Sequence, residues 1–240
     1  MPLAGTESLS ALKHWSKEEL AYRELRSAIL SGALRPGERL FPNDLASRFN
    51  VSTMPVRQAL TRLELERLVV RNPNRGLTVA PLSMKEVEEI YTMRAVLEGL
   101  ATRLATENLS AAQLDELASL LAKCEAAVAI GDRSALTKSN REFHFTIYNA
   151  SGNQLLCDTL TNLWDISGRY RPVYYADPEV PEQTLREHRT ILSALQKRDA
   201  AEAEALVRSD MEETARVLLA LVRSGIEKNE EYLDGKLPVV

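Results

Sequence analysis

The chain has 240 residues, of which 45% are hydrophobic and 27% charged. This composition is typical of a globular protein that buries a core, and it excludes a largely disordered chain. No stretch approaches the roughly 20 apolar residues that span a bilayer, and the first residues lack the pattern of a signal peptide. We therefore expect a cytoplasmic protein with no membrane partner.

The net charge of −4 is divided unevenly along the chain. Residues 15–80 hold eleven Lys and Arg against seven Asp and Glu, whereas residues 81–240 hold eighteen against twenty-six. A basic module joined to a larger acidic one suits a polyanion at one end and a different partner at the other. The charge changes sign at Pro81, where we place a domain boundary.

Three helix starts are predicted in the basic part. Each begins at a residue whose side chain can accept a backbone N–H of the first turn, and these residues are Ser16, Asn43 and Ser52. Gly32 is a predicted end of the first helix, and the third runs to about Leu68. The second and third form a helix-turn-helix.

A β-hairpin is predicted directly after these helices. Residues 68–70 and 77–79 are β-type segments, and the turn-forming residues 72–76 separate them. Three helices followed by a hairpin make a winged helix-turn-helix. We assign residues 15–81 to this DNA-binding domain and residues 1–14 to a flexible N-terminal segment.

Beyond Pro81 the β pattern disappears and long helical patterns follow, three of which open with capping boxes. The predicted helices span residues 83–107, 110–130, 133–150, 153–174, 181–197 and 199–228. We expect them to form a helical domain over residues 82–230, followed by a C-terminal tail, residues 231–240. The expected fold is thus mainly α: an N-terminal winged helix-turn-helix with a small β-hairpin wing, and a C-terminal all-α antiparallel bundle of six or seven helices.

The third helix has the pattern of a DNA-recognition helix. Apolar residues face its partner helix, while Arg57, the strongest candidate for a base or phosphate contact, faces outward. Arg75 would place a cation at the tip of the wing. The candidate DNA-binding residues are Arg35, Asn43, Thr53, Met54, Arg57, Gln58, Thr61, Arg75 and Gly76.

Two stretches of the sequence carry a family resemblance. Residues 26–40, 44–46, 49–52, 55–60 and 63–64 resemble the DNA-binding domain of GntR-family repressors. Residues 91–98, 140–144, 150–153 and 187–191 resemble the FCD effector domain of the FadR subfamily. Thr53 and Asn43 stand where family members often have charged residues, and this difference bears on the operator sequence.

Several polar residues of the helical domain are expected to face its interior. Asn140 and His144 share one helix face, and His188 and Asp210 lie in apolar rows of two later helices. Their amide, imidazole and carboxylate groups can hold a divalent ion such as Zn²⁺, Ni²⁺ or Mn²⁺. The alternative is a metal-free hydrogen-bonded network around a ligand. The resemblance implies a metal set of one Asp or Asn and three histidines, and Asp210 stands where the third histidine would be.

Arg94 also lies on an apolar helix face, where an unpaired guanidinium is costly. It either pairs with an internal carboxylate such as Glu98 or awaits the carboxylate of a ligand. The resemblance implies the second alternative. Arg94 and Glu98 are therefore the candidate effector-binding residues.

Together these features predict a ligand-responsive bacterial transcriptional regulator, a repressor rather than an enzyme. We expect a homodimer that binds a near-palindromic double-stranded DNA operator and senses a small carboxylate or sugar acid through a bound divalent metal ion. Two alternatives remain: a metal-dependent hydrolase, and an architectural DNA binder whose helical domain only dimerises.

Overall fold

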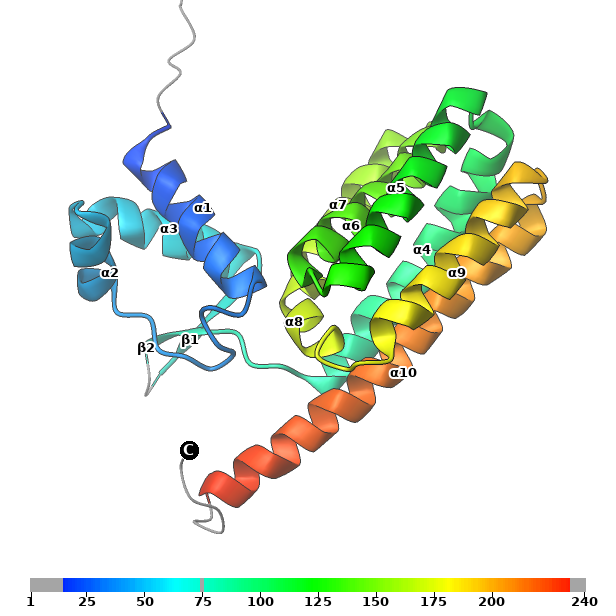
Figure 1. Ribbon diagram of the computed structural model, residues 1–240. Coiled ribbons are helices and arrows are strands. Elements are labelled where there is room, and N and C mark those ends of the chain that lie inside the picture. Colours follow the sequence, from blue (N-terminus) through cyan, green and yellow to red (C-terminus); the bar gives the residue numbers. More distant parts are fainter. Residues whose placement is uncertain (1–14, 74–75, 234–240) are drawn as a thin grey trace, which may run out of the picture. The chain divides into compact units, whose positions relative to one another are not determined.

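The computed structural model describes residues 15–73 and 76–233, the side chains of the last turns excepted (Figure 1). The chain divides into two compact units, and the division falls between Pro81 and Leu82. The first contains helices and a hairpin, and the second is entirely helical over its described residues. The prediction of a mainly α protein with a small hairpin wing and a C-terminal helical bundle is confirmed.

The first unit consists of three helices and a two-stranded antiparallel sheet. Their bounds are α1 Lys17–Leu30, α2 Pro42–Phe49, α3 Thr53–Leu65, β1 Val69–Asn72 and β2 Gly76–Val79. Ser16 caps α1 by accepting the backbone N–H of Glu19 at 3.1 Å. Asn50, the residue directly after α2, has a φ of 52°, which lies in the left-handed region that asparagine tolerates.

The predicted cap of α2 was wrong. Phe41, not Asn43, precedes the helix, and no side chain caps it, because α2 starts with Pro42. Proline suits the first helical position, since its fixed φ is already helical and the missing N–H would have had no helical partner. Ser52 does precede α3, but its side chain makes no capping hydrogen bond.

The wing pairs β1 with β2 in register from Val69 opposite Val79 to Asn72 opposite Gly76. An isolated bridge between Arg39 and Thr78 attaches the segment before α2 to the same sheet. The hairpin is one to two residues longer at its tip than the sequence pattern predicted. Arg75, the predicted cation of the wing tip, lies outside the described residues.

The second unit is a helical bundle. Its helices are α4 Met84–Asn108, α5 Ala111–Ile130, α6 Arg133–Ala150, α7 Gln154–Ser167, the 3₁₀ turn η1 Gly168–Tyr170, α8 Arg171–Tyr174, α9 Val180–Gln196 and α10 Ala200–Leu233. Ser83, Ser110 and Asp199 cap α4, α5 and α10 by accepting backbone N–H groups three residues further on, as their sequence spacing predicted. None of the described helices combines the length and apolar character needed to cross a membrane.

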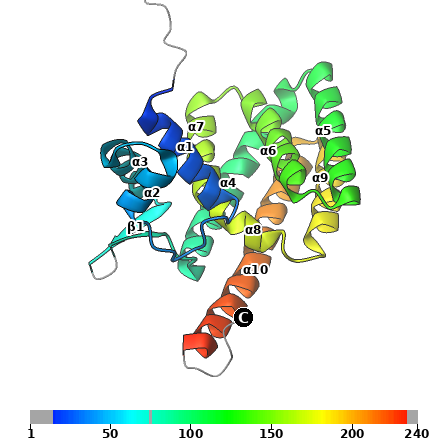
Figure 2. The ribbon, with the colours of Figure 1, turned by 60° about the vertical axis from the view of Figure 1, so that its left-hand side comes forward.

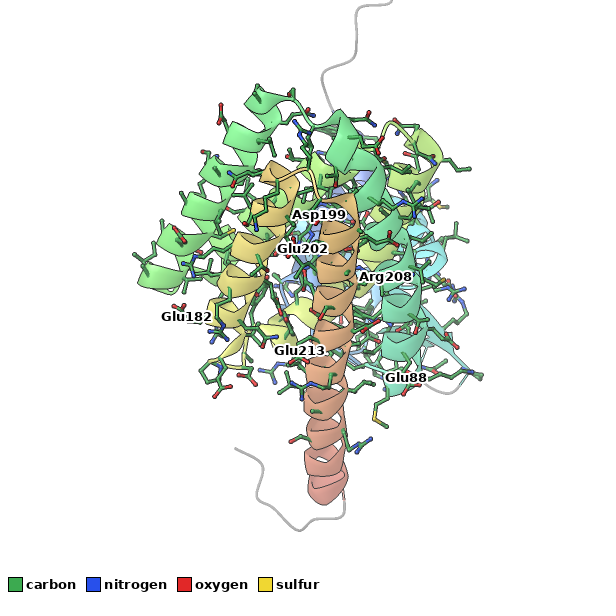
Figure 3. All side chains as sticks on the ribbon, turned by 90° about the vertical axis from the view of Figure 1, so that its right-hand side faces the viewer. Glu88, Glu182, Asp199, Glu202, Arg208 and Glu213 are labelled. Atoms are coloured by element: carbon green, nitrogen blue, oxygen red, sulfur yellow. The ribbon has the colours of Figure 1, made fainter. Side chains whose placement is uncertain are left out.

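The helix α10 lies beside both α4 and α9, as Figure 3 shows from the α10 side. It runs along the bundle and continues past one end of it (Figure 1). α5 packs on α6 and α9, and the short α8 lies against α10 (Figure 2). The core between these helices contains large aromatic side chains that are at most 1% exposed: Trp164, Tyr148, Tyr170 and Phe143.

One predicted helix, residues 153–174, is interrupted in the structure. α7 ends at Ser167, and η1 and α8 follow it. Gly168 weakens a helix, and Pro172 has no N–H to donate to the carbonyl of Gly168 four residues earlier. The Ser167 hydroxyl instead donates to the carbonyl of Trp164 at 3.0 Å. Residues 168–174 therefore do not continue α7 but form the separate short turns η1 and α8.

Candidate DNA-binding surface and ligand cavity

The recognition helix α3 has an apolar inner face and a polar outer face. Val56, Ala59, Leu60 and Leu63 are at most 1% exposed and belong to the core of the first unit. The outer face presents four of the candidate DNA-binding residues as exposed side chains: Met54, Arg57, Gln58 and Thr61. Arg57 forms no ion pair with any described residue, so its guanidinium is available to a base or a phosphate.

The other candidates lie around this helix. Thr53 is half-buried, and its hydroxyl donates to the Asn43 side chain at 3.3 Å, which joins the starts of α2 and α3. Arg35 is exposed in the turn before α2, a turn that pairs with β2 through Gly37 N–H and the Val79 carbonyl at 3.0 Å. Gly76 opens β2 with a φ of +71°. The structure therefore brings Asn43 together with the start of the recognition helix, and places Arg35 beside the wing.

Sequence analysis missed Arg48. It lies exposed in the last turn of α2 and forms no ion pair within the described residues. In a helix-turn-helix the helix before the recognition helix crosses the phosphate backbone, so a cation there is a candidate phosphate contact. Its position in the first helix of the predicted motif was the available signal. By contrast, Arg23 and Arg62 bind Glu19 within the unit.

The bundle contains a cavity of about 40 Å³. The cavity is lined by residues of α4, α6 to α10 and the turn after α8: Tyr91, Arg94, Asn140, His144, Trp164, Arg171, Tyr174, Tyr175, Thr184, Asp210, Met211 and Thr214. Four of the residues predicted to face the interior, Arg94, Asn140, His144 and Asp210, thus meet here. The Nε2 atom of His188 lies 3.2 Å from that of His144, directly behind the lining.

Arg94 is paired within the protein. Its Nε donates to Glu98 Oε1 at 2.6 Å and its Nη1 to the Ser167 hydroxyl at 3.2 Å, and Arg94 and Glu98 are at most 3% exposed. Of the two alternatives for Arg94, the structure shows the internal pair. Arg94 still lines the cavity, but its positive charge there is balanced by the carboxylate of Glu98.

Glu98 does not line the cavity. Its oxygens accept from Arg94, from Trp164 Nε1 at 2.9 Å and from the Tyr148 hydroxyl. The structure therefore gives Glu98 a different place from the one predicted: it holds Arg94 and two aromatic side chains in position.

The hydrogen bonds around His144 determine which ring nitrogens carry protons. Because the single proton of Tyr148 is donated to Glu98, the His144 Nδ1–H donates to the Tyr148 oxygen at 2.9 Å. His144 Nε2 is then unprotonated and accepts from His188 Nε2–H at 3.2 Å. Both rings remain neutral, because burial holds the pKa of His144 well below its usual value and lowers the pKa of His188 to about 3.

Asp210 faces the unprotonated nitrogen of His144. Its Oδ2 lies 3.7 Å from His144 Nε2, and its Oδ1 accepts from the Thr214 hydroxyl at 3.5 Å. Burial, and then the carboxylates of Glu187 and Glu98, hold the pKa of Asp210 well above its usual range. Nearby positive charge would favour the ionised form of this carboxyl.

The four side chains offer suitable donors for a divalent ion. His144 has an unprotonated Nε2, which accepts from His188, and a hydrogen-bonded Nδ1, and Nδ1 of His188 is buried without a partner. A ring nitrogen without a proton, with the other nitrogen hydrogen-bonded, is the form in which histidine binds a metal. However, no group of three or more His, Cys, Asp or Glu side chains among the described residues is already arranged to hold an ion. The His144–His188 hydrogen bond and the distance to Asp210 account for this. The donor chemistry fits a metal, and the side chains would have to reorient to bind one.

Arg171 is a second residue that sequence analysis missed. It opens α8, lines the cavity, and lies with its guanidinium carbon 4.5 Å from the centre of the Trp164 ring. Its Nη2 is buried and has no hydrogen-bond partner. Residue 171 is seven positions after Trp164, which in one continuous helix would have put both on the same face. That spacing was the signal that could have identified it.

An outward-facing recognition helix beside a wing, joined to a bundle with a polar cavity, is the arrangement of a DNA-binding regulator with a separate helical unit. Residues 17–79 match the model of the bacterial regulatory proteins of the gntR family, and residues 89–213 match the FCD domain. The chain belongs to the GntR family of bacterial regulatory proteins and, because it carries an FCD domain, to its FadR subfamily.

Similar proteins support this assignment. The chain is 33% identical to the HTH-type transcriptional regulator McbR of Escherichia coli over 78% of its own length and 86% of that protein. It is 31% identical to the E. coli repressor RspR over 80% and 84%. The solved structure of E. coli McbR/YncC matches with a TM-score of 0.73 at 30% identity, covering 85% of this chain and 98% of the other. These relatives are named as transcriptional regulators, which confirms the prediction of a regulator rather than an enzyme.

Proposed function

We propose that this regulator is a repressor whose operator affinity changes when a small organic acid binds in the bundle cavity. The observation that carries the proposal is the cavity itself, which is lined by two arginines, by uncharged polar side chains and by the carboxyl of Asp210. The relatives RspR and GlaR of E. coli are named repressors, which supports the direction of the effect. A ligand acts through the difference between its affinities for the two states of the protein.

We propose that the active form is a homodimer on a near-palindromic operator. α4 carries an exposed apolar stripe of Met93, Val96 and Leu100, which are 46%, 48% and 37% exposed. Such a stripe on a helix is a candidate for the contact between two copies. Sedimentation of the wild type should give a dimer, and Val96→Glu should give a folded monomer with reduced operator affinity. A dimeric Val96→Glu protein would exclude this face.

The presence of an ion is a separate proposal. Asn140, His144, His188 and Asp210 would hold a divalent ion such as Mn²⁺, Zn²⁺ or Ni²⁺, which would offer an open coordination position to an acid. The metal content of the purified protein and its melting temperature with EDTA or with each ion test it. A rise with one ion that disappears in His144→Ala would support the proposal. No bound metal, together with no rise, would leave a metal-free cavity.

The main experiment has two arms. Selection of bound genomic fragments gives the operator, and Arg57→Ala should weaken binding to it, whereas the matched variant Arg186→Ala, an exposed arginine of α9, should not. Melting temperatures and operator affinity are then measured against acetate, lactate, succinate, citrate and gluconate. A bound acid raises the melting temperature by mass action. If none alters either quantity, the bundle serves only dimerisation.

A further inference from the structure

The charges around Trp164 are unevenly compensated. Three guanidinium groups lie within 6 Å of its ring: Arg94, Arg141 and Arg171. Arg94 has Glu98, and Arg141 Nη1 has Asp165 Oδ1 at 3.2 Å. No carboxylate of the described residues forms an ion pair with Arg171. Of these three arginines, Arg171 is therefore the one that forms no ion pair with a described residue.

The other ionisable groups of the cavity do not supply a counter-ion for Arg171. Asp210 lines the cavity but forms no ion pair with Arg171, and burial, followed by the carboxylate of Glu187, raises the pKa of its carboxyl. Burial and, as the next largest cause, the nearby Arg94 guanidinium together lower the pKa of Arg171 to about 10, so Arg171 stays protonated at neutral pH. Burial also raises the pKa of Tyr91, Tyr174 and Tyr175, which keeps these phenols neutral. The neighbouring arginine only adds positive charge.

An unpaired buried guanidinium destabilises a folded protein, because a charge taken out of water needs a partner. Arg171 is partly exposed as a residue, but its Nη2 is buried without a partner, and it lies at a cavity rather than within packed side chains. The flat fork of a guanidinium matches the two oxygens of a carboxylate. The cavity of about 40 Å³ has room for a group of this size.

We propose that Arg171 is the specificity-determining residue of the cavity and binds the carboxylate of a small monoanionic acid. This inference rests on the proposed function, in which the cavity holds the effector. It differs from the sequence-based expectation, which gave that role to Arg94. One unpaired guanidinium favours a monoanion over a dianion, and its contact with the Trp164 ring, at 4.5 Å from the ring centre, holds the guanidinium at the cavity.

The test compares Arg171→Gln with Arg141→Gln, which removes a paired arginine beside the same indole. Titration calorimetry with the acid that most raises the wild-type melting temperature is performed with and without EDTA. Arg171→Gln should weaken binding about 10- to 100-fold in both conditions, as expected for loss of charged hydrogen bonds. The acid affinity of Arg141→Gln should stay within about threefold of the wild-type value. The affinity of Arg171→Lys should lie between those of the wild type and Arg171→Gln, because lysine keeps the charge but not the planar guanidinium.

The unliganded proteins provide a second measurement. Since Arg171→Gln removes an unpaired buried charge, its melting temperature without ligand should equal or exceed that of the wild type. A fall of several degrees would show that Arg171 is structural and would overturn the proposal. Unchanged acid affinity in Arg171→Gln would also overturn it, and if that acid still alters operator binding, the proposed function stands. If no acid binds the wild type, both are wrong.

Discussion

At the scale of single residues, Glu98 shows how one buried carboxylate organises the interior of the bundle. Its two oxygens receive a guanidinium, an indole N–H and a phenol from three different helices. The pair itself contributes little net stability, since both charges lost their water on folding. Removing one member is different, because the remaining donors are left buried without an acceptor.

We expect Glu98→Ala to lower the free energy of unfolding by about 3–5 kcal/mol, the range for breaking a buried ion pair. Urea denaturation followed by circular dichroism measures the change. Glu107→Ala, at an exposed position of the same helix, is the control and should change stability by less than about 0.5 kcal/mol. Equal effects at the two positions would contradict the assigned role of Glu98.

The buried histidines make stability depend on pH. The pKa of His188 falls from 6.5 unfolded to about 3 folded, so the unfolded chain takes up the proton first. The stability contributed by neutral His188 is complete above pH 6.5 and is lost as the pH falls towards 3. Asp210 and Glu187, whose pKa values are raised, act in the opposite direction.

In metal-free protein, we therefore expect His188→Gln to lose less stability than the wild type when the pH falls from 6.5 to 5. The difference between the two losses should be about 2 kcal/mol, because each pH unit corresponds to about 1.4 kcal/mol for one group. Denaturation curves at both pH values measure it, and the comparison cancels the carboxyl contributions. Parallel losses in the two proteins would show that His188 is protonated in the folded state.

At the scale of elements, the local sequence determines where the helices start, and tertiary contacts determine how the segments between the helices pack. Ser110 and Gln113 form a complete capping box at the start of α5. Replacing such a cap leaves N–H groups of the first turn without a protein acceptor.

Ser110→Ala should thus lower the free energy of unfolding by about 1 kcal/mol. The same substitution at Ser119, exposed in the middle of α5, should be neutral or slightly stabilising, since alanine favours a helix. Thermal denaturation of the two variants provides the measurement. The prediction fails if Ser119→Ala is the more destabilised of the pair.

The interruption after α7 connects the cavity to the beginning of α4. Arg171 opens α8, and the preceding Arg169 and Tyr170 contact the first turn of α4: Arg169 pairs with Glu86, and Tyr170 donates to Glu86 Oε2 at 2.6 Å. The backbone N–H of Ser83 also donates to the Tyr170 hydroxyl at 3.3 Å. Ser83 lies two residues after the division between the two units.

We therefore expect Tyr170→Phe to retain acid affinity within about threefold while reducing the effect of the acid on operator binding. The phenyl ring keeps its place in the core, whereas the hydrogen bonds to the first turn of α4 are lost. Calorimetry measures the first quantity and fluorescence anisotropy with labelled operator the second. A full operator response in Tyr170→Phe would exclude these hydrogen bonds from the coupling.

At the scale of the whole molecule, the basic charge of the DNA-binding unit makes binding to DNA depend on salt. Residues 15–80 carry eleven basic and seven acidic side chains, and several of the arginines are used in ion pairs within the unit. The salt dependence reports how many of the remaining cations contact phosphates, because each contact releases counter-ions from DNA.

Two arginines should differ in this measurement. Arg48→Ala should reduce the magnitude of the slope of log affinity against log salt by about one, as expected for a phosphate contact, and weaken all sequences equally. Arg57→Ala should cost about 1–3 kcal/mol on the operator and relax its sequence preference. Filter binding at several salt concentrations, on operator and on unrelated DNA, tests both. If Arg48→Ala relaxed the sequence preference and Arg57→Ala weakened all sequences equally, Arg48 would be the base contact and Arg57 the phosphate contact.

The sequence by itself determined the features that depend on neighbours within about four residues. The caps at Ser16, Ser83, Ser110 and Asp199 and the apolar inner face of α3 follow from such local spacing, as does the order of helices and hairpin. The polar residues facing the bundle interior were also identified in this way. That two of these residues lie side by side could be predicted only for Asn140 and His144, which are four residues apart on one helix.

Only the tertiary structure decided how buried charges are paired. Trp164 and Ser167, which share the Glu98–Arg94 network, come from a helix some 66 residues away from Glu98, and no local pattern specifies such a contact. The path of the chain after Ser167 likewise brings Arg171 to the cavity, where it forms no ion pair with a described residue. Burial makes an unpaired charge costly, and burial is a property of the packed bundle rather than of any segment of the sequence.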